Sequence, residues 1–204
     1  MRKLNNKIHY PDAKPTDMQH VTTKFFGLEP LDTKLLVEEA DNAAKIHEYT
    51  QKAFAGWTSL PLRSLHGMTG EDASDAVGEH ASSDADKFMD TPAMQPYIRS
   101  LIERVGGRPL KVRLMKMRAH SSIGEHRDNF NGDGVVVRFH IPIVTHPKVQ
   151  MSVNGQPYHM KAGELYRVDV SQRHAVVNGS SIDRIHLVFD IVADERVTNL
   201  LKFH

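Results

Sequence analysis

The stretch of sequence that decides the fold class is VVVRFHIPI, at residues 135–143. Its apolar side chains recur at every second position, as they do in a β-strand, and Arg138 and His140 lie on the opposite face. The stretch RIHLVFDI, at residues 184–191, repeats the pattern and places Arg184 opposite its apolar residues. Such strands bury the apolar face. The polar face then either meets solvent, as in a plain sandwich, or lines a barrel interior suited to an anionic ligand.

Seven short segments of the chain have the pattern of strands, and turn residues separate them. They are Lys111–Arg118, Val135–Val144, Val149–Val153, Tyr158–Met160, Glu164–Val170, His174–Val177 and Arg184–Val192. Two helices are expected before them, at residues 32–49 and 91–105; Thr91 caps the second, and Gly106 follows it. Residues 56–62 are expected to turn the chain between the helices. This order predicts a mainly β fold, a sandwich or barrel, with N-terminal helices that buttress the sheet.

The 204 residues fit one domain, which we expect to span residues 1–204. Residues 1–109 would hold an N-terminal arm, the helices and an acidic loop. Residues 110–192 would form the β core, and residues 193–204 a C-terminal extension. The acidic loop, at residues 68–90, carries seven acidic side chains among Gly, Ala and Ser. Its composition fits either a lid over a site or a solvated surface insertion.

Composition excludes several classes of function. The 26 basic and 25 acidic residues nearly cancel, so binding to nucleic acid is not expected. The chain has no Cys, which excludes disulfide scaffolds, thiolate zinc sites, iron–sulfur clusters and cysteine nucleophiles. No apolar stretch approaches the roughly 20 residues of a membrane span. The first residues also lack a signal-peptide pattern, so we expect a cytoplasmic protein without a membrane partner.

The side chains best suited to chemistry are His126, Asp128 and His174. His126 and Asp128 point the same way if their stretch is extended, and His174 begins a later strand. Two His and one carboxylate leave three positions of an iron ion open, which is the arrangement of non-haem Fe(II) oxygenases. Arg184 follows on a polar strand face, where its planar guanidinium suits a dicarboxylate co-substrate.

Each of these residues also has an ordinary structural interpretation. The His–Asp pair is compatible with a surface pair, because His-x-acid pairs occur often by chance. Arg184 is compatible with a structural ion pair, with Asp190 or Asp169 as its partner. Arg138 and His140 are compatible with an outward, solvated strand face. The residues alone leave these alternatives open.

The joint pattern resembles the aspartyl/asparaginyl β-hydroxylase family, which includes bacterial hydroxylases of free amino acids such as proline. The resemblance covers about residues 110–191. The motifs that carry it are RL at 113–114, IGEHRD at 123–128, VRFHIPI at 137–143, GELYRVD at 163–169, His174, Asn178 and RIHLVFD at 184–190. It implies a double-stranded β-helix, the jelly-roll or cupin-like fold, and Fe(II)/2-oxoglutarate chemistry with O₂. By position, His126, Asp128 and His174 would bind the iron, and Arg184 the distal carboxylate of 2-oxoglutarate.

The resemblance also implies roles for residues around this centre. Arg138 and His140 match family residues at the carboxylates of co-substrate and substrate, and which carboxylate each contacts stays open. The segment WTSLPL, which begins at Trp57, is similar to a Trp–Pro–Leu segment of the bacterial members and suggests a substrate contact. Asp128 is present where vertebrate members lack the ligand carboxylate, which places the chain nearer the bacterial enzymes. Met115 stands where some members have a Ser that holds the co-substrate.

The function that these residues and the resemblance imply is hydroxylation of an unactivated carbon of an amino acid, with succinate and CO₂ as co-products. The substrate would be a free amino acid or an Asp or Asn residue in a peptide. Two other functions compete with it: a cupin-like module that binds a metal and an anion without catalysis, and a metal-dependent isomerase or lyase. Arg184 discriminates among them, because an isomerase or lyase with the same ligands does not need an arginine ten residues past the last His. The sequence indicates neither the individual substrate nor the oligomeric state.

Overall fold

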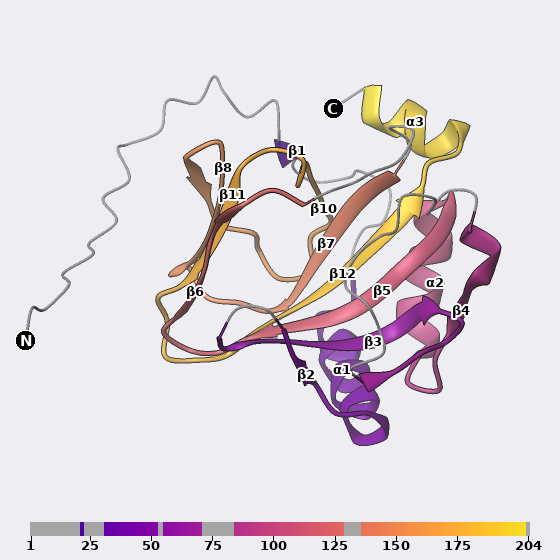
Figure 1. Ribbon diagram of the computed structural model, residues 1–204, viewed down its shortest axis with the longest axis horizontal. Coiled ribbons are helices and arrows are strands. Elements are labelled where there is room, and N and C mark those ends of the chain that lie inside the picture. Colours follow the sequence, from indigo (N-terminus) through magenta and orange to yellow (C-terminus); the bar gives the residue numbers. More distant parts are fainter. Residues whose placement is uncertain (1–20, 23–30, 53–54, 71–83, 129–135, 203–204) are drawn as a thin grey trace, which may run out of the picture.

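The computed structural model of the protein describes residues 21–22, 31–52, 55–70, 84–128 and 136–202 (Figure 1). The helices are α1 (Thr33–Ile46), α2 (Pro96–Val105) and α3 (Glu195–Lys202), and a 3-10 turn lies at Ala85–Lys87. The strands are β1 (Val21–Thr22), β2 (Thr50–Gln51), β3 (Trp57–Leu65), β4 (Phe88–Asp90), β5 (Arg108–Met117), β6 (Ser121–His126), β7 (Val136–Val144), β8 (Val149–Val153), β9 (Gln156–Tyr158), β10 (Tyr166–Val168), β11 (His174–Asn178) and β12 (Arg184–Val192).

The strands form two antiparallel sheets (Figure 1). The larger sheet has the order β1-β10-β7-β12-β5-β3-β2, with β4 paired to β3, and the smaller sheet has the order β6-β11-β8-β9. Consecutive strands alternate between the sheets, as β5 to β8 show, which is the winding of a double-stranded β-helix. The mainly β, jelly-roll fold that the sequence predicts is therefore confirmed.

The outer face of the larger sheet packs against the helices and forms the main core. Leu187, Phe189 and Ile191 of β12 lie there, next to apolar residues of β7 and β5 and to the buried faces of α1 and α2. The rings of Phe139 and Phe189 stack with centroids 5.4 Å apart. The alternation at residues 184–191 thus separates an apolar face from a polar face, as predicted, because every second side chain packs against the helices.

The opposite face of the larger sheet turns toward the smaller sheet. An apolar cluster joins the two sheets at one end; it includes Met117, Met151 and Tyr166, with Trp57 packed against it. Elsewhere this face is polar yet buried: Arg138, His140, Arg184 and His186 are each at most 9% exposed. The interpretation of these side chains as an outward, solvated face is therefore wrong.

Several elements differ from the sequence-based expectations. Residues 57–62 belong to strand β3 and only Gly56 lies in a turn; β3 accommodates Pro61 at a register shift opposite β5, where a missing N–H is tolerated. Helix α2 begins at Pro96, and Thr91 instead caps a short turn before it: the Thr91 hydroxyl accepts from the Ala93 N–H and donates to the Pro61 carbonyl. The C-terminal extension contains α3.

The acidic loop is described only in part. Residues 71–83 lie outside the described part of the chain, and so does Val135. Residues 84–90 are not irregular, because they include the 3-10 turn and strand β4, which pairs with β3. The N-terminal arm, apart from β1, also lies outside the described residues.

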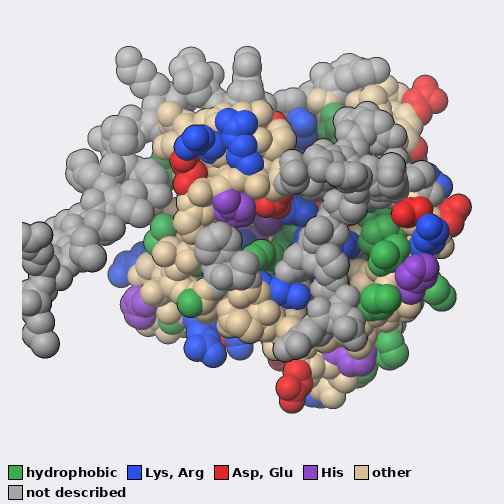
Figure 2. All heavy atoms as spheres, viewed as in Figure 1, with side chains coloured by type: hydrophobic (Ala, Val, Ile, Leu, Met, Phe, Trp, Pro, Cys, Tyr) green, Lys and Arg blue, Asp and Glu red, His purple; other side chains and the backbone are tan. Residues whose placement is uncertain are grey.

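The charged surface is mixed. Figure 2 shows Lys and Arg side chains scattered among Asp and Glu over the coloured part of one face, without one continuous basic area there. Among the described residues, no helix is both long enough and apolar enough to cross a membrane.

A buried carboxylate holds the two N-terminal helices together. Glu39 of α1 is 6% exposed and accepts hydrogen bonds from the backbone N–H groups of Tyr97 and Ile98, at 2.7 and 2.8 Å. These N–H groups belong to the first turn of α2, whose N-cap residue Gln95 makes no side-chain cap. Glu39 therefore supplies the cap from another helix and compensates the positive end of the α2 dipole.

We expect Glu39→Ala to lower the free energy of unfolding by about 2 kcal/mol, because two buried N–H groups lose a charged acceptor. Urea denaturation followed by circular dichroism measures the loss. The control is Glu38→Ala, which changes the exposed neighbour on the same helix. Equal stability of the two variants would contradict the capping role.

Candidate functional site

The pairing of β6 with β11 brings two histidines together. In this antiparallel register His174 lies directly opposite His126, at the last residue of β6 and the first of β11. Their imidazole centroids are 4.2 Å apart. The chain then leaves β6, and the Asp128 N–H donates to the Val170 carbonyl at 2.9 Å, which fixes the position of the Asp128 backbone.

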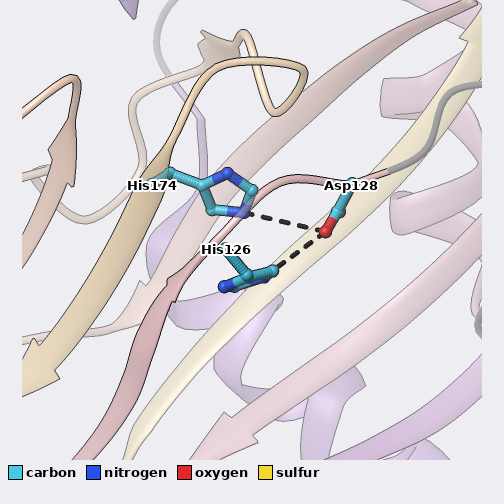
Figure 3. A group of neighbouring side chains, drawn as sticks. All are labelled: His126, Asp128 and His174. Carbon is cyan, nitrogen blue, oxygen red and sulfur yellow. Dashed lines mark ion pairs between the residues drawn. The ribbon is translucent and has the colours of Figure 1, made fainter.

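The three side chains converge on one point (Figure 3). Their ligand atoms all lie within 4.8 Å of one another. The Asp128 Oδ1 atom is 3.3 Å from His126 Nε2 and 3.8 Å from His174 Nε2. His174 is buried, whereas His126 and Asp128 are about one quarter exposed, so the group is open on one side.

The histidines are oriented for metal binding by their other ring nitrogen. His126 Nδ1 lies 2.8 Å from the Gly124 carbonyl, and His174 Nδ1 lies 2.9 Å from the Gln172 carbonyl. A carbonyl only accepts, so each Nδ1 carries the proton and each Nε2 keeps its lone pair. Burial lowers the pKa of His174 and favours the neutral ring that binds a metal. The donor set fits a divalent iron ion with open positions.

A buried ion-pair network binds the Asp128 carboxylate of this triad. Arg138 of β7 donates to Asp128 Oδ2 and also binds Asp190 of β12 in a bidentate pair, with N···O distances of 2.7 and 3.0 Å. Arg113 of β5 reaches the same Asp190 carboxylate at 3.5 Å. Asp190 is fully buried, and burial alone would raise its pKa, but the nearby Arg138 and Arg113 charges lower it.

Arg138 is therefore held firmly as a cation. Burial disfavours its charged form, yet the Asp190 and Asp128 carboxylates outweigh this effect and raise its pKa. These ion pairs rule out Asp190 as the structural partner of Arg184, because the Asp190 carboxylate binds Arg138 and Arg113. Asp169, the other aspartate considered as an Arg184 partner, instead accepts from the N–H and hydroxyl of Ser171.

Arg184 lies on the same inner face but lacks a carboxylate partner among the described residues. It is 3% exposed, and its Nε makes no hydrogen bond there. One terminal nitrogen donates to His186 Nδ1 at 2.7 Å. Burial lowers the pKa of Arg184 to about 9, which shows how poorly its charge is compensated. A buried guanidinium of this kind fits an anionic ligand, and the distal carboxylate of 2-oxoglutarate has the required charge and planar geometry.

Two histidines line the space between Arg138 and Arg184. His140 and His186 are buried, and their Nδ1 atoms lie 3.5 Å apart. Burial and the neighbouring Arg184 charge hold the pKa of both well below the usual value, so both rings are neutral. Trp57 is half-buried at the start of β3, opposite Met117, and its expected substrate contact stays a prediction.

Most of the chain matches a known protein family. A sequence profile described as aspartyl/asparaginyl beta-hydroxylase matches residues 32–194. The chain belongs to this family. The resemblance inferred from the strand and ligand motifs is thus confirmed, and the match extends upstream of those motifs to α1.

Within the aspartyl/asparaginyl β-hydroxylase family, the chain is similar to an L-proline cis-4-hydroxylase of Rhizobium meliloti (strain 1021). The two are 25% identical over 180 residues, which cover 85% of this chain and 62% of the relative. The chain thus matches less than two thirds of that relative's length. Among solved structures, a 2OG-Fe(II) oxygenase family oxidoreductase of Burkholderia pseudomallei aligns over 78% of this chain and 79% of its own, with 13% identity and a TM-score of 0.45. A cupin domain of Bordetella pertussis covers 43% of this chain and 86% of its own, with 18% identity and a TM-score of 0.34.

The structure adds residues that sequence reasoning did not assign to the site. Asp190 is recognisable as polar on its strand face, but its partners depend on the β7–β12 register, which places Asp190 opposite Arg138. Arg113 joins them from β5, where it lies opposite Val188. No sequence signal revealed these pairings, because the strands concerned are separated by long stretches of chain.

We expect the metal site to depend on all three ligands. His126→Ala, Asp128→Ala and His174→Ala should each weaken Mn(II) binding about 100-fold or more, since loss of an outer-shell partner alone costs about 10- to 100-fold in such sites. Isothermal titration of the metal-free protein measures this. The control His120→Ala removes an exposed histidine outside the triad. Full Mn(II) affinity in His174→Ala would rule out this centre.

We expect Asp190→Asn to lower the free energy of unfolding by about 3 kcal/mol at pH 7, because buried arginines lose their counter-charge. The Asp190 pKa is lowered in the folded state, so its stabilising effect is present above the unfolded pKa of about 4. The difference between wild type and variant should therefore shrink as the pH falls through the folded pKa.

Urea titrations at several pH values measure this difference, and the exposed Asp41→Asn on α1 is the control. A stability difference that stays constant down to about pH 2 would contradict the ionised state of Asp190.

Proposed function

We propose that this chain is an Fe(II)- and 2-oxoglutarate-dependent dioxygenase that hydroxylates an unactivated carbon of an amino acid. The observation that carries the proposal is the combination of a convergent His-Asp-His group with a buried arginine, Arg184, that lacks a carboxylate partner among the described residues. A metal-dependent isomerase or lyase needs only the first feature. A dicarboxylate co-substrate accounts for both.

The proposed roles follow from the geometry. His126, Asp128 and His174 would hold the iron through Nε2, Oδ1 and Nε2, because the remaining donor atoms of these side chains are already engaged. Arg184 would hold the distal carboxylate of 2-oxoglutarate. Iron with 2-oxoglutarate and O₂ supplies the oxidising chemistry, with succinate and CO₂ as co-products.

The substrate is proposed to be an amino acid, either free or as an Asp or Asn residue of a peptide. Membership of the family supports this class, and the similarity to an L-proline cis-4-hydroxylase favours a free amino acid. Positive charge near the metal agrees with it: Lys111, Arg113 and Arg138 are buried on one face, around Asp190. Arg138 reaches both Asp190 and Asp128, so a substrate carboxylate at Arg138 would lie close to the iron. His140 would lie between the two carboxylate sites, next to His186.

The decisive assay is succinate formation from 2-oxoglutarate under air with Fe(II). Free amino acids, beginning with L-proline, and short Asp- or Asn-containing peptides are added one at a time. We expect one of them to stimulate succinate formation at least about tenfold and to gain one oxygen atom by mass spectrometry.

His126→Ala should abolish turnover, and Arg184→Met should mainly raise the KM for 2-oxoglutarate by about 100-fold, because a buried charge-assisted pair is lost. His120→Ala should leave both unchanged. Binding of metal and 2-oxoglutarate without succinate formation for any candidate would favour the non-catalytic cupin-like module. Failure to bind 2-oxoglutarate would refute the co-substrate assignment.

A further inference from the structure

A buried hydroxyl near Arg184 has no role in the site described so far. The Tyr158 hydroxyl oxygen is shielded from solvent and makes no hydrogen bond with any described residue. A buried polar group without a partner is costly, and native proteins rarely keep one without a function. The group is therefore available to an acceptor or donor from outside the described part of the chain.

Strand pairing and packing place Tyr158 in the neighbourhood of Arg184. Tyr158 ends β9 in the smaller sheet and pairs with Met151 of β8. It packs against the apolar cluster that joins the sheets, and Met117 of that cluster lies opposite Arg184 in the β5–β12 register. Tyr158 of the smaller sheet therefore lies in the neighbourhood of Arg184 in the larger sheet. The electrostatics agree, because burial raises the pKa of Tyr158 while the Arg184 charge opposes the rise.

The groups around Arg184 are donors. Arg184 donates to His186 Nδ1, so His186 must carry its proton on Nε2, which has no hydrogen-bond partner among the described residues. Arg184 Nε–H is also unused there, and the Tyr158 hydroxyl can donate. Three unused donors from two sheets, one of them on Arg184 itself, thus lie near one poorly compensated positive charge. An anion with several acceptor lone pairs would satisfy these donors and compensate the charge at the same time.

We propose that Tyr158 is a further co-substrate-binding residue, whose hydroxyl donates to the same distal carboxylate of 2-oxoglutarate that Arg184 binds. The inference deepens the proposed function and rests on it. It also predicts selectivity: a 2-oxo acid without the distal carboxylate would leave the Arg184 and Tyr158 donors buried and unpaired. A site built this way rejects such an analogue strongly.

The test is Tyr158→Phe, which removes only the hydroxyl. Titration of the Mn(II)-loaded protein with 2-oxoglutarate in the absence of O₂ measures binding without turnover. We expect the Kd to rise about 10- to 100-fold, the range for a hydrogen bond to a charged group. The melting temperature of the ligand-free variant should stay the same or rise, because an unpaired buried hydroxyl is gone. A purely structural tyrosine would behave in the opposite way.

Two controls test whether the Tyr158 hydroxyl contacts the distal carboxylate and no other part of the ligand. Tyr97→Phe removes a hydroxyl that accepts from the Asp32 N–H beside the helices, and it should not change the Kd for 2-oxoglutarate. The second control is the ligand 2-oxopentanoate at millimolar concentration, which has the 2-oxo acid end but no distal carboxylate. Wild type and Tyr158→Phe should bind it equally weakly.

The outcomes distinguish this inference from the proposed function. If wild type binds 2-oxoglutarate and Tyr158→Phe binds it equally well, the Tyr158 assignment is overturned while the proposed function stands. If Tyr158→Phe weakened the binding of 2-oxopentanoate as much as that of 2-oxoglutarate, the assignment would also be overturned. The hydroxyl would then contact a part that both ligands share and not the distal carboxylate. No 2-oxoglutarate binding by wild type would overturn both.

Discussion

Buried positive charge is the constraint on which the rest of this structure depends. The inner face of the larger sheet places three arginines, Arg113, Arg138 and Arg184, between two layers of the protein. Each must meet negative charge, because an isolated buried cation is not tolerated. The fully buried Asp190 carboxylate supplies this negative charge to Arg113 and Arg138. Arg184 has no such partner among the described residues, and in the proposed function a bound carboxylate would neutralise its charge.

The metal ligands depend on this network as well as on strand pairing. The β6–β11 register sets His126 opposite His174, and backbone carbonyls fix their tautomers. Asp128 follows the end of a strand, where the backbone is less constrained, and Arg138 restrains its carboxylate by holding Oδ2. Oδ1 then remains for the metal. The ion pair with Asp190 fixes Arg138 in turn, so a residue of β12 would help to position a metal ligand without contacting the metal itself.

The sequence predicted those parts of the molecule that depend on local periodicity. The alternation in residues 184–191 correctly separated a core face from a polar face, and the spacing of His126, Asp128 and His174 indicated a convergent group. What it could not predict depends on register and tertiary contacts. Strand β3 was mistaken for a turn because it contains Pro61. Proline is tolerated in a strand where the pairing is irregular, and the register shift beside Pro61 becomes visible only in the structure. The bonding of Asp190 required knowledge of which strands are neighbours. Family resemblance, and not spacing alone, made the iron assignment specific.

The two halves of the proposed site differ in how they are prepared for their ligands. The metal end is pre-organised by contacts within the protein, because each ligand side chain already has its second atom engaged. The Arg184 end is different: its donors are buried but unsatisfied, and the ligand-free protein must bear that cost. Binding of a dicarboxylate, as proposed, would recover this cost, so the affinity gained at this end would reflect relief of the unliganded state as well as new contacts. A co-substrate that lacked the second carboxylate would obtain no such gain, and selectivity therefore follows from what the fold leaves unpaired.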